Sequence, residues 1–338
     1  MNFFKRIGYI IVFLSAFLSP TLVNAEKLAA GFTIEGVPNN NQVDKNVGYF
    51  YISEVPSATN ELKVKLKNSS DDDKTLVIKL VDANTNVNGL VDYTGKLTNH
   101  TSLKTPLTSI AQVTEQEVKV TKNSEVETTI KIAMPKAPFE GVIVGGVVVS
   151  EKMEESAEKN LAINNTYSYT IAIVLTNNET TPIKNNVSLE LDLIGTKLFD
   201  GKKVVRADIL NKNPYMFEDA TISGTIYEKE TKKEVVKNKK EHVEIAPYSA
   251  FPFQFDWEKD TIKPGKYSFV GEATSGDKKW TFKRDFEVTG KEAKKLNEET
   301  VFKVYIPNWL RLGANIIAVV AFVGTLGLIV RIRNRKRV

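Results

Sequence analysis

The sequence predicts a mostly β protein: two tandem immunoglobulin-like β-sandwich domains followed by one C-terminal transmembrane helix. Two observations lead to this prediction. Between residues 26 and 289, apolar and polar side chains alternate along many short segments that are separated by turn-forming residues, which is typical of half-buried strands in a sandwich. Residues 312–330 form an almost wholly apolar stretch without a charge, and a cluster of arginine and lysine follows it.

These patterns divide the chain into six parts. They are a signal peptide at 1–25, a first β-sandwich at 26–160, a second β-sandwich at 161–290, a stalk at 291–311, a transmembrane helix at 312–330 and a basic cytoplasmic tail at 331–338. The border between the sandwiches is placed in a charged stretch, residues 151–160, which we expect to be an exposed connection. A strand predicted at 166–176 can complete either sandwich, so its domain stays open.

The N-terminus has the parts of a secretory signal peptide. Lys5 and Arg6 precede the apolar residues 7–18, and small residues around Ala25 suit cleavage after that position. No cysteine follows the cleavage position, so this is not a lipoprotein signal. The mature chain is therefore predicted to be exported.

The stretch 312–330 is long enough to cross a bilayer. At about 1.5 Å per residue it extends roughly 30 Å, the thickness of the hydrocarbon core. The basic residues between Arg331 and Arg337 are expected to stay on the cytoplasmic side. We therefore predict a single-pass type I membrane protein whose ectodomain lies outside the cell.

The basic character of the chain comes from its targeting segments. The whole chain carries +5, the signal peptide +2 and the tail +5, so residues 26–330 carry −2. A weakly acidic ectodomain offers no electrostatic basis for binding nucleic acid. The chain has no cysteine, so an exported domain has no disulfides and depends on its cores for stability. An exported ectodomain without cysteine favours a location on the cell surface of a Gram-positive bacterium.

Strands of the first block follow from period-two patterns. Residues 61–67 and 74–81 predict two strands joined by a turn at 68–73, and residues 126–132 predict another strand. Residues 142–149 are rich in β-branched side chains, as in a strand that is buried on both faces. Gly145 and the glycine after it indicate a bulge or the close approach of another backbone.

The second block shows the same alternation. Two sets of residues are each predicted to share one buried face of a strand: Val187, Leu189, Leu191 and Leu193, and then Phe251, Phe253, Phe255 and Trp257. The apolar positions between 280 and 288 indicate a register change near Arg284. Residues 291–297 are polar and helix-competent, and we interpret them as the start of the stalk.

An asparagine-rich loop is the best local candidate for a binding site. Asn84, Asn86 and Asn88 precede Gly89 with the spacing of the first half of a calcium-binding loop. Gly95 stands where such a loop has its bidentate glutamate, and no helices are predicted to flank it. We interpret the segment as a structural loop, with calcium binding as the alternative.

Tyrosines are the second kind of candidate. Tyr49, Phe50 and Tyr51 are consecutive, so at least one of them points away from the core. Together with Tyr93 and the asparagines of the loop, Tyr49 and Tyr51 offer rings and amides that suit a carbohydrate polymer. The alternative is that the rings pack under a neighbouring domain.

The sequence contains no catalytic motif. His100 and His242 are its only histidines and lie in separate blocks, and no metal-ligand cluster, nucleophile elbow or phosphate-binding loop is present. A hydrolase that uses a carboxylate pair has no such signature, but nothing in the sequence points to one. We therefore expect a protein that is not an enzyme and that needs no cofactor.

Several segments resemble the WxL-interacting proteins of Gram-positive cell surfaces. In the first block they are Asn41–Phe50, the end of the asparagine-rich loop at 88–93 and the glycine-centred strand at 139–147; in the second they are 246–249, 264–267 and 280–282. The order of signal peptide, two domains, membrane span and basic tail also matches. None of the chain's tryptophans lies in a Trp-x-Leu motif, so the chain resembles the interacting partner and not the WxL protein itself.

The resemblance implies binding functions. It implies a first domain that binds peptidoglycan and a second domain that binds host matrix proteins. It also implies a partner: secreted WxL-domain proteins that form a cell-wall complex with this chain. It carries over no site at the level of single residues.

Two functions from different classes follow. One is a membrane-anchored scaffold that binds peptidoglycan and holds secreted WxL proteins in a cell-wall complex. The alternative is an adhesin whose second domain directly binds host extracellular-matrix proteins. A glycan-processing enzyme is a distant third.

Overall fold

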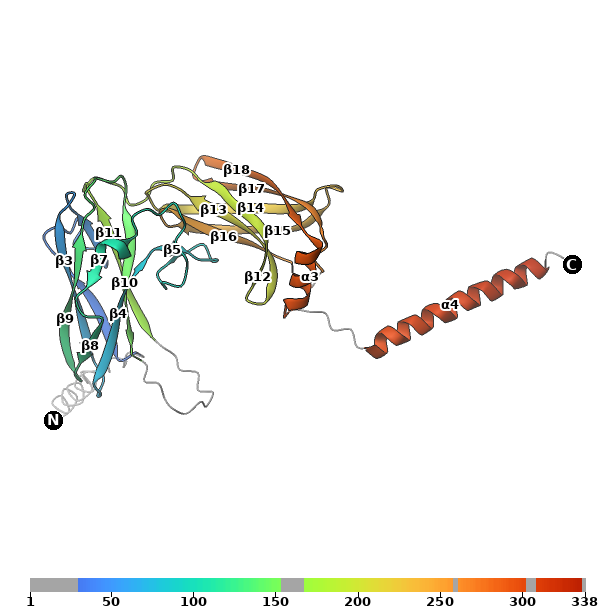
Figure 1. Ribbon diagram of the computed structural model, residues 1–338, viewed down its shortest axis with the longest axis horizontal. Coiled ribbons are helices and arrows are strands. Elements are labelled where there is room, and N and C mark those ends of the chain that lie inside the picture. Colours follow the sequence, from blue (N-terminus) through green and yellow to red (C-terminus); the bar gives the residue numbers. More distant parts are fainter. Residues whose placement is uncertain (1–29, 153–166, 258–260, 302–307, 336–338) are drawn as a thin grey trace, which may run out of the picture. The chain divides into compact units, whose positions relative to one another are not determined.

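The computed structural model describes residues 30–152, 167–257, 261–301 and 308–335 (Figure 1). Strands dominate these residues, so the prediction of a mostly β protein is confirmed. The chain divides into two compact units: a first of Met1–Asp82, Thr105–Phe139 and Val144–Glu179, and a second of Ala83–Lys104, Glu140–Ile143 and Thr180–Val338. The predicted signal peptide at 1–25 and most of the charged stretch 151–160 lie outside the described residues.

The first unit consists of two sheets (Figure 1). One sheet has the order β1 (Phe32–Val37), β3 (Thr59–Asn68), β9 (Ser124–Ala133) and β7 (Ala111–Val113). The other has the order β2 (Phe50–Ser53), β11 (Ser168–Thr176), β10 (Ile143–Glu151), β4 (Lys74–Asp82) and β8 (Glu117–Val120). A single helical turn, α2 (Leu107–Ile110), precedes β7 in the chain.

Alternating side chains build the core of this unit. On β3, Leu62, Val64 and Leu66 are fully buried and alternate with lysines, because successive side chains of a strand point to opposite faces. Phe32 of β1 meets Tyr169 of β11 edge to face with ring centroids 5.2 Å apart, which joins the two sheets. The predicted strands at 61–67 and 74–81 and the turn between them are present as β3, β4 and their connection.

The strand left open by the sequence belongs to the first unit. It is β11, which pairs in parallel with β2, with Ile173 opposite Phe50. The first unit therefore extends to Glu179, whereas the sequence placed the border at 160. The segments 153–166 that would show the charged connection lie outside the described residues.

The glycine in β10 marks a close approach and not a bulge. β10 pairs with β4 in unbroken antiparallel register from Gly145 to Glu151. A Cβ on Gly145 would lie 2.4 Å from the carbonyl oxygen of Val81 and 2.5 Å from Cδ2 of Leu107. The missing side chain thus makes room for the fully buried Leu107 of α2.

The second unit is also built from two sheets (Figure 1). One has the order β12 (Glu190–Phe199), β13 (Lys202–Asn211) and β16 (Ser249–Asp256). The other has the order β15 (Glu234–Ile245), β14 (Phe217–Glu228), β17 (Gly265–Ser275) and β18 (Lys278–Val288). A small ladder of β5 (Asn84–Thr85) and β6 (Val91–Asp92) belongs to the same unit.

Phenylalanine rings fill the core between these sheets. The predicted face of β16 is confirmed, since Phe251, Phe253 and Phe255 are each no more than 1% exposed. The rings of Phe253 and Phe255 lie 4.8 Å apart, and Phe255 meets Phe269 of β17 at 5.7 Å. Such tilted and edge-to-face contacts add to the free energy gained by burial.

The structure corrects three predictions about strand faces. Val187 is 45% exposed and precedes β12, which begins at Glu190. Leu193 is 61% exposed, because the register of β12 against β13 shifts between Leu191 and Leu193 and turns the later side chain outward. The register change predicted near Arg284 is absent, and β18 pairs regularly with β17. Arg284 is exposed although it alternates in phase with the apolar residues of β18, and its guanidinium donates to the carbonyl oxygens of Leu191 and Asp192 beside the β12 shift.

The segment predicted as the start of a stalk is part of the second core. It forms α3 (Gly290–Glu299), whose first turn is capped by the Thr289 side chain accepting from the backbone N–H of Glu292. Ala293 and Leu296 are buried in the core of the unit, because their spacing puts both on one face of the helix. The stalk prediction therefore fails for these residues.

The last helix, α4 (Asn308–Arg335), covers the residues predicted to span the membrane. Within the described parts of the chain, no helix combines the length and the apolar character needed to cross a bilayer.

Candidate functional site

The six residues singled out from the sequence are divided between the two units. Tyr49 and Tyr51 belong to the first unit, and Asn84, Asn86, Asn88 and Tyr93 belong to the second. The two groups of candidate residues are therefore described separately, each within its own unit.

In the first unit, Tyr49 ends a polar loop, residues 38–49, that leads into β2. Buried Gln42 organises this loop: its Nε2 donates to the carbonyl oxygens of Asp44 at 2.8 Å and Tyr49 at 3.0 Å, and its Oε1 accepts from the backbone N–H of Tyr51 at 3.3 Å. Tyr51 is only 8% exposed, and burial raises the pKa of its hydroxyl. Tyr51 is thus a core residue, while the half-buried Tyr49 keeps part of its ring accessible.

A chain of amides fixes the same loop to the sheets. Asn39 Nδ2 donates to Asn60 Oδ1 at 2.7 Å, and Asn60 Nδ2 donates to Glu54 Oε1 at 2.6 Å. Asn177 Nδ2 then donates to the Glu54 carbonyl oxygen at 2.7 Å. Sequence reasoning missed this cluster because its members come from distant segments. Asn60, a buried polar residue in the alternating strand β3, is the one signal that could have pointed to it.

In the second unit, the asparagine-rich loop is closed by its own hydrogen bonds. Asn86 Oδ1 accepts from the backbone N–H groups of Asn88 at 2.9 Å and Leu90 at 3.3 Å. Asn84 is buried and donates to Asn99 Oδ1 at 2.9 Å, whereas Asn88 is exposed and Tyr93 half-buried. In the described residues, no three His, Asp or Glu side chains gather as a metal site would require. The contacts are those of a hydrogen-bonded turn.

This loop is one part of a longer segment, 83–104, that packs within the second unit. Thr85 Oγ1 accepts from the backbone N–H of Ala246 at 3.0 Å, and the Gly89 carbonyl oxygen accepts from Glu244 at 2.8 Å. Ser102 Oγ donates to the carbonyl oxygen of Tyr248 at 3.3 Å. The segment, which the sequence assigned to the first block, therefore joins the turn between β15 and β16.

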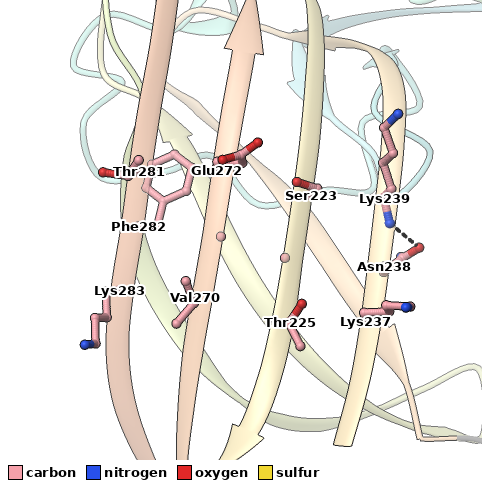
Figure 2. Close-up of a pocket in the computed structure, with 12 residues that line it drawn as sticks. Ser223, Thr225, Lys237, Asn238, Lys239, Val270, Glu272, Thr281, Phe282 and Lys283 are labelled. Carbon is pink, nitrogen blue, oxygen red and sulfur yellow. Dashed lines mark hydrogen bonds between the residues drawn. The ribbon is translucent and has the colours of Figure 1, made fainter. Parts of the chain in front are cut away.

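A groove of about 780 Å³ lies on the four-stranded sheet of the second unit (Figure 2). Its lining comes from four neighbouring strands, β15, β14, β17 and β18. The lining residues are Ser223, Gly224, Thr225, Lys237, Asn238, Lys239, Val270, Gly271, Glu272, Thr281, Phe282 and Lys283. Of the two central strands, β14 contributes Ser223 and Thr225 and β17 contributes Val270 and Glu272, while lysines lie on the outer two strands (Figure 2).

The lining carries three lysines and one carboxylate. The carboxylate, Glu272, is paired with Lys279 at 2.7 Å. Lys239 pairs with Glu241 at 2.5 Å, and this hydrogen-bonded lysine lowers the pKa of Glu241. Lys237 is more loosely paired with Glu234, at 3.8 Å. The groove therefore has a positive lining on an ectodomain of negative net charge.

Comparison with known families assigns a domain family to each half of the sequence. A family model described as the WxL Interacting Protein peptidoglycan binding domain matches residues 32–151, and one described as the host binding domain matches residues 158–298. The chain belongs to the WxL Interacting Protein family. This membership confirms the resemblance seen in the sequence. As a WxL Interacting Protein, the chain is a cell-surface binding protein with a peptidoglycan-binding and a host-binding domain.

Other comparisons of this WxL Interacting Protein give fold-level likeness at most. No curated protein matches the chain. The Escherichia coli chaperone DraB is 13% identical over 76% of this chain and 98% of its own, with a TM-score of 0.30. The PapD-like domain 7 of human CEP192 is 11% identical over 44% of this chain and 84% of its own, with a TM-score of 0.27. Scores this low carry no argument about function.

Proposed function

We propose that this WxL Interacting Protein is a membrane-anchored cell-surface scaffold that binds peptidoglycan and holds secreted WxL proteins in a cell-wall complex. The observation that carries the proposal is the succession of two binding domains along one chain, at 32–151 and 158–298. Linking two modules makes the second binding event intramolecular, which raises overall affinity without new contacts. Both matched domains are binding domains, so we propose no enzymatic role.

The proposed anchor rests on the sequence. Residues 312–330 carry no charge and precede basic residues, and Lys5, Arg6 and the apolar run behind them suit a signal peptide. The chain would then be a single-pass type I protein, with its ectodomain within and at the surface of a Gram-positive cell wall.

The proposed wall-binding surface is the Gln42 loop of the first unit, residues 38–49. Tyr49 offers an accessible ring, and the exposed Asn41 and Asn46 offer amides on the same loop. Rings pack on sugar faces, and amides pair with hydroxyl and acetamido groups. Because the ectodomain carries only −2, peptidoglycan binding should depend little on salt.

Sedimentation with purified peptidoglycan tests this surface. The full-length protein in detergent should pellet with the wall, and Tyr49→Ala should reduce the pelleted fraction about threefold to tenfold through loss of ring contact. Tyr227→Ala is the matched control, because Tyr227 is half-buried like Tyr49 but lies in the second unit, within the residues matched to the host binding domain. This change should leave the pelleted fraction unchanged. Equal loss in both variants, or no loss in Tyr49→Ala, would contradict the assignment to this loop.

The scaffold role has its own test. Crosslinking on intact cells followed by purification of the full-length protein should recover secreted WxL proteins. Recovery of peptidoglycan alone would leave a wall-binding protein without the scaffold role.

The alternative function is an adhesin whose second domain binds host extracellular-matrix proteins directly. The match of residues 158–298 to a host binding domain favours it. Binding of purified matrix proteins to the full-length protein, measured without any WxL protein present, supports this alternative. Binding that appears only after a WxL protein is added supports the scaffold.

A further inference from the structure

The groove on the second unit is on the solvent face of its four-stranded sheet. Inward-facing positions of β14 and β17, such as Ile222, Ile226 and Phe269, are fully buried. The alternate positions, among them Thr225 and Val270, point to the other face. Lys237, Val270 and Lys283 on this face are exposed in the part of the second unit that the structure describes, so their side chains are available to a partner.

Strand register arranges the lining in rows across the sheet. Lys237 lies opposite Thr225, Thr225 opposite Val270, and Val270 opposite Lys283. Figure 2 shows this row running from Lys237 on β15 to Lys283 on β18. Each row residue comes from a different strand, so the two lysines stand at opposite rims with Thr225 and Val270 between them.

The next row differs in its charge. It runs from Lys239 through Ser223 and Glu272 to Thr281. Its carboxylate is already paired with Lys279 and its lysine with Glu241. In the row of Lys237 and Lys283, the pair of Lys237 with Glu234 is longer, at 3.8 Å. This row therefore keeps more of its positive charge for a ligand.

The floor of the groove is apolar at its centre and carries no accessible ring. Val270 is 43% exposed, and the one aromatic residue of the lining, Phe282, is 6% exposed. Sugars in protein sites usually stack on aromatic faces, whereas an aliphatic side chain packs on an exposed valine through apolar contact. The lining thus fits a peptide better than a glycan.

We propose that this groove binds an extended acidic peptide segment of a partner protein, with two carboxylates that meet Lys237 and Lys283 and an apolar side chain between them that covers Val270. Neighbouring strands lie about 4.8 Å apart, so three spacings separate the two rims by about 14 Å. An extended chain advances about 3.3 Å per residue, so carboxylates about four residues apart match the lysines. The proposal goes beyond wall binding and names the chemistry that the second unit recognises.

A direct binding measurement tests the proposal on the full-length protein in a zwitterionic detergent. The probe is a fluorescent nonapeptide with two glutamates four positions apart and a leucine midway between them. The control peptide replaces both glutamates with glutamine. We expect the glutamate peptide to bind in a salt-sensitive way, since exposed charge pairs are screened, and the glutamine peptide to bind at least about tenfold more weakly.

Variants locate the binding. The double change Lys237→Gln and Lys283→Gln should weaken the glutamate peptide about tenfold, and Val270→Ser should weaken it about threefold. Lys212→Gln is the matched control, because Lys212 is exposed like Lys237 and pairs with Glu190 of the other sheet. All these side chains are exposed, and melting curves of each variant verify that folding is retained.

Three results would overturn the proposal. They are equal affinity for the two peptides, equal weakening by Lys212→Gln and the double change, and binding of a sulfated polysaccharide in the groove with no binding of the peptide. Peptidoglycan sedimentation of the same variants is measured independently of peptide binding. Failure of this proposal is therefore distinguishable from failure of wall binding.

Discussion

Two buried asparagines, one in each unit, hold the ends of strands in place. Asn68, at the end of β3, donates from Nδ2 to the carbonyl oxygens of Asp72 at 2.8 Å and Val120 at 3.1 Å. Asn211, at the end of β13, donates to those of Tyr215 at 2.7 Å and Ile245 at 3.2 Å. Both are no more than 1% exposed. Each amide satisfies at least one buried carbonyl group, that of Val120 or Ile245, and an unmade hydrogen bond at a buried group is costly.

Replacing Asn68 with alanine should destabilise the first unit by about 2–3 kcal/mol, because it leaves buried carbonyl oxygens without donors. Urea unfolding followed by fluorescence measures the change. Asn40→Ala is the control: Asn40 is exposed, and its loss should cost less than about 0.5 kcal/mol. Similar costs for the two variants would show that the Asn68 bonds add no stability.

Gly145 in β10 lies where a side chain would be crowded. Gly145→Ala should cost at least about 2 kcal/mol, because its Cβ would meet the Val81 carbonyl oxygen and Leu107 at distances where the backbone has to move. Gly195→Ala, where nothing lies within 4 Å of the added Cβ, should leave stability unchanged or raise it slightly. Denaturant midpoints of the two variants separate crowding from any general intolerance of alanine in strands.

Among the secondary-structure elements, β12 and α3 differ from what the apolar pattern of the sequence predicted, because tertiary packing determines their buried residues. The register shift of β12 exposes Leu193, and Arg284 from β18 supplies the hydrogen bonds beside it. Arg284 thus replaces an apolar side chain in the alternation of β18 and is exposed. The alternation in the sequence correctly predicted the apolar residues on either side of Arg284, but the register change predicted near Arg284 is absent.

The helix α3 gives a test of whether the segment after the second sandwich is a stalk. Leu296→Ala should destabilise the second unit by about 2–3 kcal/mol, because it removes a buried side chain, 5% exposed, from the core. Lys295→Ala, one residue earlier on the exposed face, should change stability by less than about 0.5 kcal/mol. Thermal unfolding distinguishes them, and equal melting temperatures would restore the stalk interpretation.

At the scale of the whole molecule, the second unit is assembled from segments that are far apart in the sequence. Residues 83–104 interrupt the first unit between β4 and α2, yet their hydrogen bonds go to the turn between β15 and β16. Within the second unit, β13 is buried on both faces: Val205 and Ile209 face the core, while Val204 and Leu210, on the other face, are at most 2% exposed. A sandwich cut out as residues 161–290 therefore lacks part of its own structure.

Replacing residues 84–103 with a short Gly-Ser linker in the ectodomain 30–299 should destabilise the second unit. The change removes the partner of the Ala246 N–H and the acceptor for Glu244, and each buried donor left unsatisfied costs about 1–3 kcal/mol. Differential scanning calorimetry and binding of a dye to exposed apolar surface measure the effect. An unchanged transition for the second unit would show that the segment is an accessory loop.

Strands and their buried faces could be predicted from the sequence wherever they follow from local periodicity. Alternation over 61–67 and 251–257 fixed strands and their buried faces, because side-chain direction in a strand repeats every two residues. The ordered segments at 41–50, 139–147 and 280–282 were enough to indicate the family. The tyrosine and asparagine candidates followed from residue type alone, so the sequence named rings and amides without showing which are accessible.

Contacts between distant segments determine which parts of the chain belong together. The tertiary structure buried Tyr51 and left Tyr49 accessible, moved β11 into the first unit and residues 83–104 into the second, and gathered Lys237, Thr225, Val270 and Lys283 into one row. These relations depend on contacts between residues that are distant along the chain. Local preferences carry no information about such pairings, since they are set by how whole sheets bury their apolar faces.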